Sequence, residues 1–177
     1  MIKRISALFA LSFTIFCFAQ VKWMSIEQAL KAQEQEPKKI LIDFYSERCA
    51  PCKTMELYTY NHPVIAEYLN EHYYAVKFDA HGDKTFQLFG KSFGNSEKNK
   101  KGTKGMHDFT RFLNVNAVPS IVFLDEQSMP ITLLQGALTA KELEPYIPFF
   151  AKDLYKKIQT REQWESYQKK FKSKIKD

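Results

Sequence analysis

The sequence predicts an α/β fold in three layers, an α/β/α sandwich with a central mixed β-sheet. Three observations support it. Helical and strand-like segments alternate along the chain, residues 40–45 form an apolar run interrupted only by Asp43, and 45% of the 177 residues are hydrophobic. An aromatic content of 15% is ample for a packed core, and a chain of this length is expected to form one domain.

The N-terminus has the pattern of a secretory signal peptide over residues 1–19. Lys3 and Arg4 precede an apolar run over residues 5–18, and the small residue Ala19 follows it. The run is shorter than the roughly 20 residues that span a bilayer, which favours a cleaved signal over a membrane anchor. We therefore expect a mature protein that begins near residue 20 and is periplasmic or secreted.

The next part of the chain is predicted to alternate helix and strand. Residues 25–33 form an amphipathic helix with Ser25 as its cap, and residues 40–45 form a buried strand. A helix starts at the Cys49-Ala50-Pro51-Cys52 segment, where proline suits the first turn, and runs to about residue 59. It restarts at residue 63, with Asn61 or His62 as the cap, and residues 73–78 form the second strand.

Residues 81–107 differ in composition from the rest of the chain. They hold five of the six glycines together with a cluster of lysines, which predicts a loop-like insertion. Phe86, Phe89 and Phe93 lie close to helical spacing and can dock the insertion on the body. If strand 73–78 runs parallel to strand 40–45, the insertion leaves the same sheet edge as Cys49 and can contact a partner; an idle surface loop is the alternative.

The second half is predicted to contain two paired strands and further helices. Residues 108–113 form a short helix, and residues 120–124 and 131–135 form a hairpin. A helix begins near Thr139, and the prolines after it kink or restart it. A capping-box pattern at Thr160 starts a last helix to about residue 174. These elements predict a domain over residues 20–150 and a basic C-terminal helical extension over residues 151–177.

The net charge of +6 comes largely from lysines in two stretches, residues 84–104 and 152–176. Clusters of this kind bind nucleic acid in some proteins and are simply solvated in others. In an exported protein, solvated surface is the better interpretation, and no nucleic-acid partner is expected.

Cys49 and Cys52 form a C-x-x-C pair directly after the strand at residues 40–45. The third cysteine, Cys17, lies in the predicted signal peptide, so neither residue of the pair has another partner in the mature chain. This excludes a network of structural disulfides, and the pair is then either a redox pair or half of a metal site. Tetrahedral zinc needs four ligands, and the four histidines are scattered, so a redox pair without metal or cofactor is expected.

Residues 42–53, Ile-Asp-Phe-Tyr-Ser-Glu-Arg-Cys-Ala-Pro-Cys-Lys, resemble the active-site segment of thioredoxins. Val118-Pro119-Ser120 resembles their cis-proline loop, and residues 135–139 resemble their last turn from strand to helix. The resemblance covers residues 23–150 apart from the insertion. Residues 53–64 are similar to the periplasmic C-terminal domain of the thiol:disulfide interchange reductase. The resemblance implies a thioredoxin-like fold and an exported thiol–disulfide oxidoreductase.

The resemblance also implies roles for individual residues. Cys49, at the helix N-terminus, is expected to be an exposed thiolate that attacks a substrate disulfide. Cys52, one turn further in, resolves the mixed disulfide, and Asp43 is a buried carboxyl that helps to deprotonate it. Lys77 matches the lysine that neighbours this aspartate. Pro119 is expected to be cis and to lie against the cysteines.

Residues that flank the cysteines are expected to bind the substrate. The backbone of Val118 can pair with an extended substrate segment, and Arg48, Ala50 and Pro51 surround the disulfide. Arg48 and Tyr45 replace two tryptophans that are usual in thioredoxins, and the charge of Arg48 favours the Cys49 thiolate. The Ala-Pro dipeptide lacks the histidine of strongly oxidising relatives, which favours a reductase.

The sequence therefore predicts an exported monomeric enzyme that reduces protein disulfides and receives electrons from a membrane partner. A disulfide oxidase or isomerase is the main enzymatic alternative. A chaperone-like binding module with an incidental C-x-x-C is an alternative from a different class. Two local alternatives are also open: Asp43 bound only to water at the strand end, and Pro119 in an ordinary trans turn.

Overall fold

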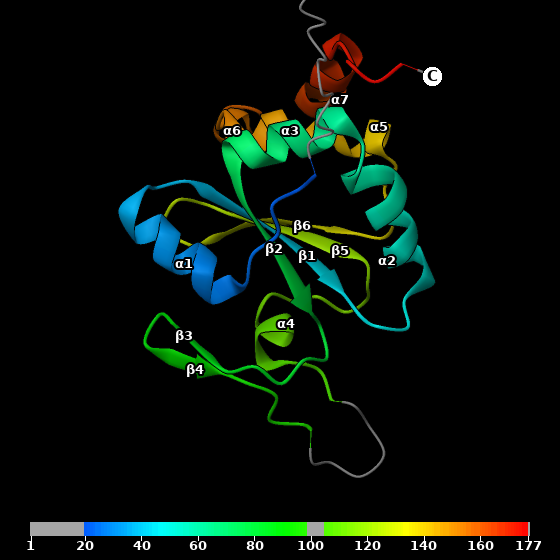
Figure 1. Ribbon diagram of the computed structural model, residues 1–177. Coiled ribbons are helices and arrows are strands. Elements are labelled where there is room, and N and C mark those ends of the chain that lie inside the picture. Colours follow the sequence, from blue (N-terminus) through cyan, green and yellow to red (C-terminus); the bar gives the residue numbers. More distant parts are fainter. Residues whose placement is uncertain (1–19, 99–104, 177) are drawn as a thin grey trace, which may run out of the picture.

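The computed structural model describes residues 20–98 and 105–176. The predicted signal peptide lies outside these residues. A four-stranded sheet with the order β2-β1-β5-β6 forms the centre (Figure 1). Its strands are β1 (Lys39–Tyr45), β2 (Tyr73–Asp79), β5 (Ser120–Leu124) and β6 (Pro130–Gln135).

The sheet is mixed, as the sequence predicts. β1 runs parallel to β2 and antiparallel to β5, and β6 runs antiparallel to β5. None of the helices in the described part of the chain has the length and apolar character needed to span a bilayer.

Helices cover both faces of the sheet, so the predicted α/β/α layering is confirmed (Figure 1). One face carries α2 (Ala50–Met55), α3 (Pro63–His72), α5 (Ala140–Leu143) and α6 (Tyr146–Ala151). The other face carries α1 (Ile26–Gln35) and α4 (Asp108–Phe112), together with a hairpin of β3 (Phe86–Leu88) and β4 (Lys91–Phe93).

The central strand β1 divides the interior into two cores. Leu41 packs with residues of α2, α3 and α5, whereas Ile40, Ile42 and Phe44 pack with residues of α1, α4 and the hairpin. Successive side chains of a strand point to opposite faces, so Asp43 lies on the same face as Leu41. A carboxyl is thereby placed in an otherwise apolar core beneath the helices that follow the cysteines.

The helix that follows Cys49 is not a single α-helix to residue 59. It changes after α2 into a π-helix, η1 (Glu56–Tyr60). The wider π turn admits one more residue, so Thr59 and Tyr60 are both buried while Leu57 and Tyr58 are exposed. Of the two predicted caps, His62 takes the position: its Nδ1 accepts a hydrogen bond from the Val64 N–H at 3.3 Å and starts α3.

The expected helical arrangement of Phe86, Phe89 and Phe93 is wrong. Phe86 and Phe93 lie opposite each other in the β3–β4 hairpin, their rings stack at 5.6 Å, and both pack on Phe109 of α4. Phe89 lies in the hairpin turn with φ 52° and is 45% exposed. Cross-strand pairing, not helical periodicity, therefore docks this segment on the sheet.

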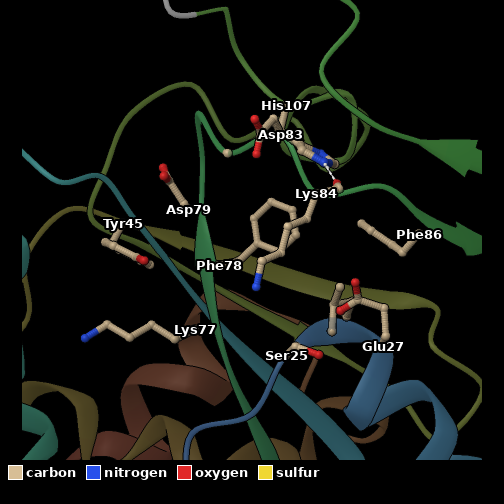
Figure 2. Close-up of a pocket in the computed structure, with 12 residues that line it drawn as sticks. Ser25, Glu27, Tyr45, Lys77, Phe78, Asp79, Asp83, Lys84, Phe86 and His107 are labelled. Carbon is tan, nitrogen blue, oxygen red and sulfur yellow. Dashed lines mark hydrogen bonds between the residues drawn. The ribbon is translucent and has the colours of Figure 1, made fainter. Parts of the chain in front are cut away.

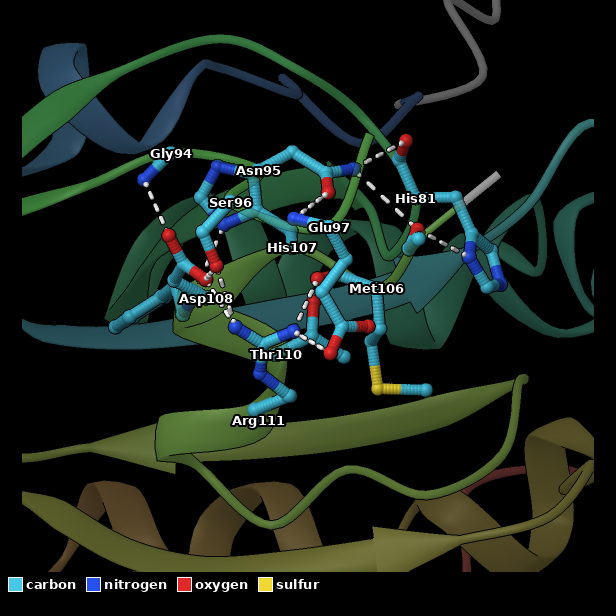
Figure 3. A network of polar contacts seen from close by, with 12 residues as sticks. His81, Gly94, Asn95, Ser96, Glu97, Met106, His107, Asp108, Thr110 and Arg111 are labelled. Atoms are coloured by element: carbon cyan, nitrogen blue, oxygen red, sulfur yellow. Dashed lines mark hydrogen bonds and ion pairs between the residues drawn. The ribbon is translucent and has the colours of Figure 1, made fainter. Parts of the chain in front are cut away.

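A polar network joins the same segment to α4 (Figure 3). The Asn95 amide donates to the carbonyls of His81, Gly82 and Gly105, and Arg111 pairs with Glu97 and Asp108. The segment leaves the carboxyl end of β2, and β2 is parallel to β1. It therefore emerges at the sheet edge from which β1 leads to Cys49.

The C-terminal segment packs on the helices of the first face. Trp164 of α7 (Arg161–Lys170) stacks on Tyr146 at 4.9 Å between ring centroids. The buried carboxylate of Glu144 accepts hydrogen bonds from the Lys174 N–H at 2.7 Å and from the Ser173 hydroxyl at 2.5 Å. The last helix ends at Lys170 and not near residue 174, because the following residues turn back to Glu144.

Candidate active site

Cys49 and Cys52 are joined by a disulfide at the start of α2. Cys49 is the N-cap, and its Sγ accepts a hydrogen bond from the Cys52 N–H at 3.1 Å. Pro51 occupies the first turn, where an N–H would have no partner within the helix. The backbone N–H groups at the start of a helix have no carbonyl partner within that helix. When the disulfide is reduced, these groups at the start of α2 can stabilise a thiolate on Cys49.

Both cysteines are nearly buried in the disulfide form. Cys49 is 8% exposed and Cys52 is 6% exposed, in contrast to the expectation of an exposed Cys49. The disulfide bond and the contact with the Cys52 N–H hold the Cys49 sulfur close to the helix. Arg48, Ala50 and Pro51 are exposed beside the pair, as are Glu47 and Lys53.

Asp43 is a buried carboxyl on the face of β1 that α2 and η1 cover. It is 2% exposed, and its Oδ1 accepts a hydrogen bond from the Tyr60 hydroxyl at 3.1 Å. Burial raises the pKa of Asp43 to about 6; the Tyr60 hydrogen bond and the Lys77 charge oppose this shift, and the Glu56 charge adds to it. A carboxyl with such a pKa can exchange a proton near neutral pH.

Lys77 lies beside Asp43 in the parallel pairing of β1 and β2. Its ammonium group forms an ion pair with Glu56 at 2.7 Å, and it also lies over the rings of Trp23 and Tyr45, at 5.7 and 5.3 Å from their centroids. Lys77 is therefore a neighbour of the carboxyl, as the resemblance implies, but its direct anionic partner is Glu56.

The Val118–Pro119 peptide bond is cis, as expected from the resemblance. Pro119 immediately precedes β5, where Ser120 pairs with Phe44, so it lies at the carboxyl end of β1. Its carbonyl accepts the Gly136 N–H at 2.9 Å. Among the described residues, the N–H and C=O of Val118 have no hydrogen-bond partner, which leaves both groups available to an added strand.

The fold thus gathers every predicted site residue at one edge of the sheet. The members are Asp43, Arg48, Cys49, Ala50, Pro51, Cys52, Lys77, Val118 and Pro119. The sequence analysis missed Glu56 and Tyr60. Glu56 follows Cys52 by four residues, a helical spacing that could have suggested it. Tyr60 had no such signal, because only the π turn directs it inward.

A cavity of about 230 Å³ adjoins this edge at the carboxyl end of β2 (Figure 2). Tyr45 and Lys77 line it together with Lys84 and Asp83 from the segment after β2. Its walls therefore carry charges of both signs. Within residues 20–98 and 105–176, no group of three or more His, Cys, Asp or Glu side chains could hold a metal ion.

Residues 26–151 match the family described as "Thioredoxin-like domain". Over 138 residues, 76% of its length, the chain is 24% identical to the thiol:disulfide interchange protein DsbD of Photorhabdus laumondii. It spans only 20% of that protein.

Solved structures share the fold. A thioredoxin-fold protein from Helicobacter pylori has a TM-score of 0.59 and 17% identity, over 86% of this chain and 88% of that one. The structure named DsbH oxidoreductase has a TM-score of 0.55 and 19% identity, over 81% and 93%. A thioredoxin from Thermus thermophilus has a TM-score of 0.55 and 16% identity, over 74% and 87%.

Proposed function

Because the chain belongs to the thioredoxin-like family, we propose that it is an exported thiol–disulfide oxidoreductase that reduces protein disulfides through Cys49 and Cys52. One observation carries the proposal: Cys49, joined to Cys52 by a disulfide, is the N-cap of α2, and Asp43, with a pKa of about 6, is buried on the sheet face that this helix covers. In this proposal Cys49 supplies the attacking sulfur and Asp43 acts as the proton acceptor.

The proposed reaction starts from the reduced protein. The Cys49 thiolate attacks one sulfur of a substrate disulfide; a Cys49–substrate disulfide forms, the substrate S–S bond breaks, and the other substrate sulfur leaves and takes up a proton. Asp43 accepts the thiol proton of Cys52, whose sulfur then attacks Cys49. The Cys49–Cys52 disulfide forms, the second substrate sulfur leaves, and two electrons have passed to the substrate.

The residues around the disulfide are proposed to hold the substrate. The unpaired N–H and C=O of Val118 bind an extended segment as an added strand. Arg48, Ala50 and Pro51 offer an exposed contact surface beside it. Residues 81–107 leave the same sheet edge and are proposed to contact the substrate or the electron donor.

Export and re-reduction complete the proposal. Residues 1–19 act as a cleaved signal peptide, residues 20–150 form the catalytic domain, and residues 151–177 form its basic extension. The protein works as a monomer outside the cytoplasm. A dithiol of a membrane protein returns it to the reduced state, since the reaction leaves it oxidised after each cycle.

The direction of exchange can be tested with both redox forms of the purified protein. Dithiothreitol-reduced protein, freed of reductant, is mixed with a disulfide-containing protein, and new substrate thiols are counted. Oxidised protein is mixed with the same substrate, reduced and unfolded. We expect about one substrate disulfide opened per protein and slow reverse transfer, because the Ala50-Pro51 dipeptide lacks a histidine that would stabilise the reduced form. Fast reverse transfer would show an oxidase.

A further inference from the structure

The Tyr60 side chain is buried directly against the candidate proton acceptor. It is 1% exposed, and among the described residues its hydroxyl has a single hydrogen-bond partner, Oδ1 of Asp43, at 3.1 Å. Burial, and then the charge of Asp43, raise the pKa of Tyr60 well above its ordinary value. The hydroxyl therefore keeps its proton and donates a hydrogen bond to the carboxylate.

The π turn brings Tyr60 to this position. Met55 and Tyr60 lie five residues apart and are both buried, a separation that matches the i to i+5 repeat of a π-helix. In a continuous α-helix a five-residue step turns the side chain by about 140°, so the two would not share a face. The departure from α-helix thus places the hydroxyl under Asp43.

A packed frame holds the ring of Tyr60 in place. Trp23, from the segment before α1, meets it edge-on at 4.9 Å between ring centroids.

Four titratable groups interact electrostatically with Asp43: Tyr60 and Glu56 of η1, Lys77 of β2 and Tyr45 of β1. On β5, its register partner is the apolar Ile121. Of these groups, only Tyr60 forms a hydrogen bond with the carboxyl.

We propose that Tyr60 is a positioning residue for the reaction: its hydroxyl orients the Asp43 carboxylate and favours the ionised form that accepts the proton of Cys52. The Tyr60–Asp43 bond itself follows from the geometry, whereas its consequence for the rate rests on the proposed function.

Removal of the Tyr60 hydroxyl should make the ionised form of Asp43 less stable relative to the protonated form. A hydrogen bond to a charged group favours that charge, so Tyr60→Phe should raise the pKa of Asp43 further, by about one unit. The fraction of ionised Asp43 then falls about fivefold at pH 6 and changes little at pH 8. The rate of mixed-disulfide resolution should follow the same pattern.

The test measures the Asp43 carboxyl and the exchange rate separately. Carboxyl ¹³C NMR of the oxidised protein gives the pKa of Asp43, and stopped-flow mixing of the reduced protein with a disulfide substrate gives the pH profile from 5.5 to 8.5. Tyr73→Phe is the matched control, because Tyr73 is also buried and its hydroxyl donates to the Ile147 carbonyl at 2.5 Å, away from Asp43. Phenylalanine keeps the ring that packs on Trp23, so Tyr60→Phe should fold.

The outcomes separate the inference from the proposed function. A raised pKa of Asp43 in Tyr60→Phe, with no change in Tyr73→Phe, supports the positioning role. A pKa that is unchanged or lowered in Tyr60→Phe overturns it, whatever happens to the rate. If the pKa rises but the rate profile stays fixed, the Tyr60–Asp43 bond stands and Asp43 is not the proton acceptor of the proposed reaction.

Discussion

Replacement of Cys49 by serine is expected to abolish disulfide reduction, and replacement of Cys52 by serine is expected to leave the protein bound covalently to its substrate. Serine is not a nucleophile toward disulfides at neutral pH, so Cys49→Ser should lower the rate at least about a thousandfold. Cys52→Ser keeps the attacking sulfur at the helix N-terminus but removes the sulfur that releases the substrate.

Thiol release from a protein disulfide measures the first effect, and non-reducing electrophoresis detects the trapped complex. Thr54→Ala is a suitable control, because Thr54 lies on the same helix, is exposed, and its hydroxyl donates a hydrogen bond to the Ala50 carbonyl at 3.2 Å. It should change the rate less than about twofold, as surface substitutions usually do. Full biological activity of Cys49→Ser would instead support the chaperone-like alternative.

Asp43→Asn is expected to make the protein more stable at neutral pH and slower as a reductase. The pKa of Asp43 rises from 3.8 to about 6 because of burial, so the folded protein binds this proton more tightly than the unfolded chain. Between these pH values stability falls as pH rises, and above pH 6 the ionised carboxyl lowers the free energy of unfolding by up to about 3 kcal/mol. Asparagine removes that charge.

Urea denaturation at pH 7.5 and pH 4 checks the sign of this effect. The gain should be about 1–3 kcal/mol at pH 7.5 and should largely vanish near pH 4, where the wild-type carboxyl is protonated when folded. Loss of the proton acceptor should slow reduction by roughly one to two orders of magnitude.

Asp125→Asn serves as the control for Asp43→Asn. The Asp125 carboxylate accepts the N–H groups of Gln127 and Met129 at 2.9 and 2.8 Å in the β5–β6 turn, so this change should not increase stability. An Asp43→Asn protein that is less stable than wild type at pH 7.5, or that keeps the full rate, would contradict the role assigned to Asp43.

Local signals explain why most of the fold could be predicted from the sequence. β1 is an apolar run around Asp43, α2 begins at a C-x-x-C segment that contains a proline, and Thr160 forms the capping box that the sequence indicates. A helix also begins at Thr139, as predicted. Each of these signals comes from a few neighbouring residues in the sequence. The cis bond before Pro119 could be anticipated only from the resemblance to thioredoxins.

The features that the sequence did not predict depend on contacts between distant segments. Phe86 and Phe93 meet through strand pairing. The chain leaves the helical path after α7 because Ser173 and Lys174 form hydrogen bonds with Glu144, which lies 29 and 30 residues earlier in the sequence. The π turn of η1 has no local signature, and it determines that Tyr60 and not a neighbour contacts Asp43. The cysteines, Asp43, Lys77 and the cis-proline were therefore predictable, whereas Tyr60 and Glu56, which also act on the proton affinity of Asp43, were missed.

The reduction potential of the Cys49–Cys52 pair, measured at equilibrium with glutathione on the purified protein, tests the central claim most directly. Reference potentials run from about −270 mV for thioredoxin to about −120 mV for a strongly oxidising relative. A reductase with an Ala-Pro dipeptide should lie in the reducing half of this range, below about −200 mV. A potential near −120 mV would mean that the protein donates disulfides, and that the Arg48 charge outweighs the missing histidine.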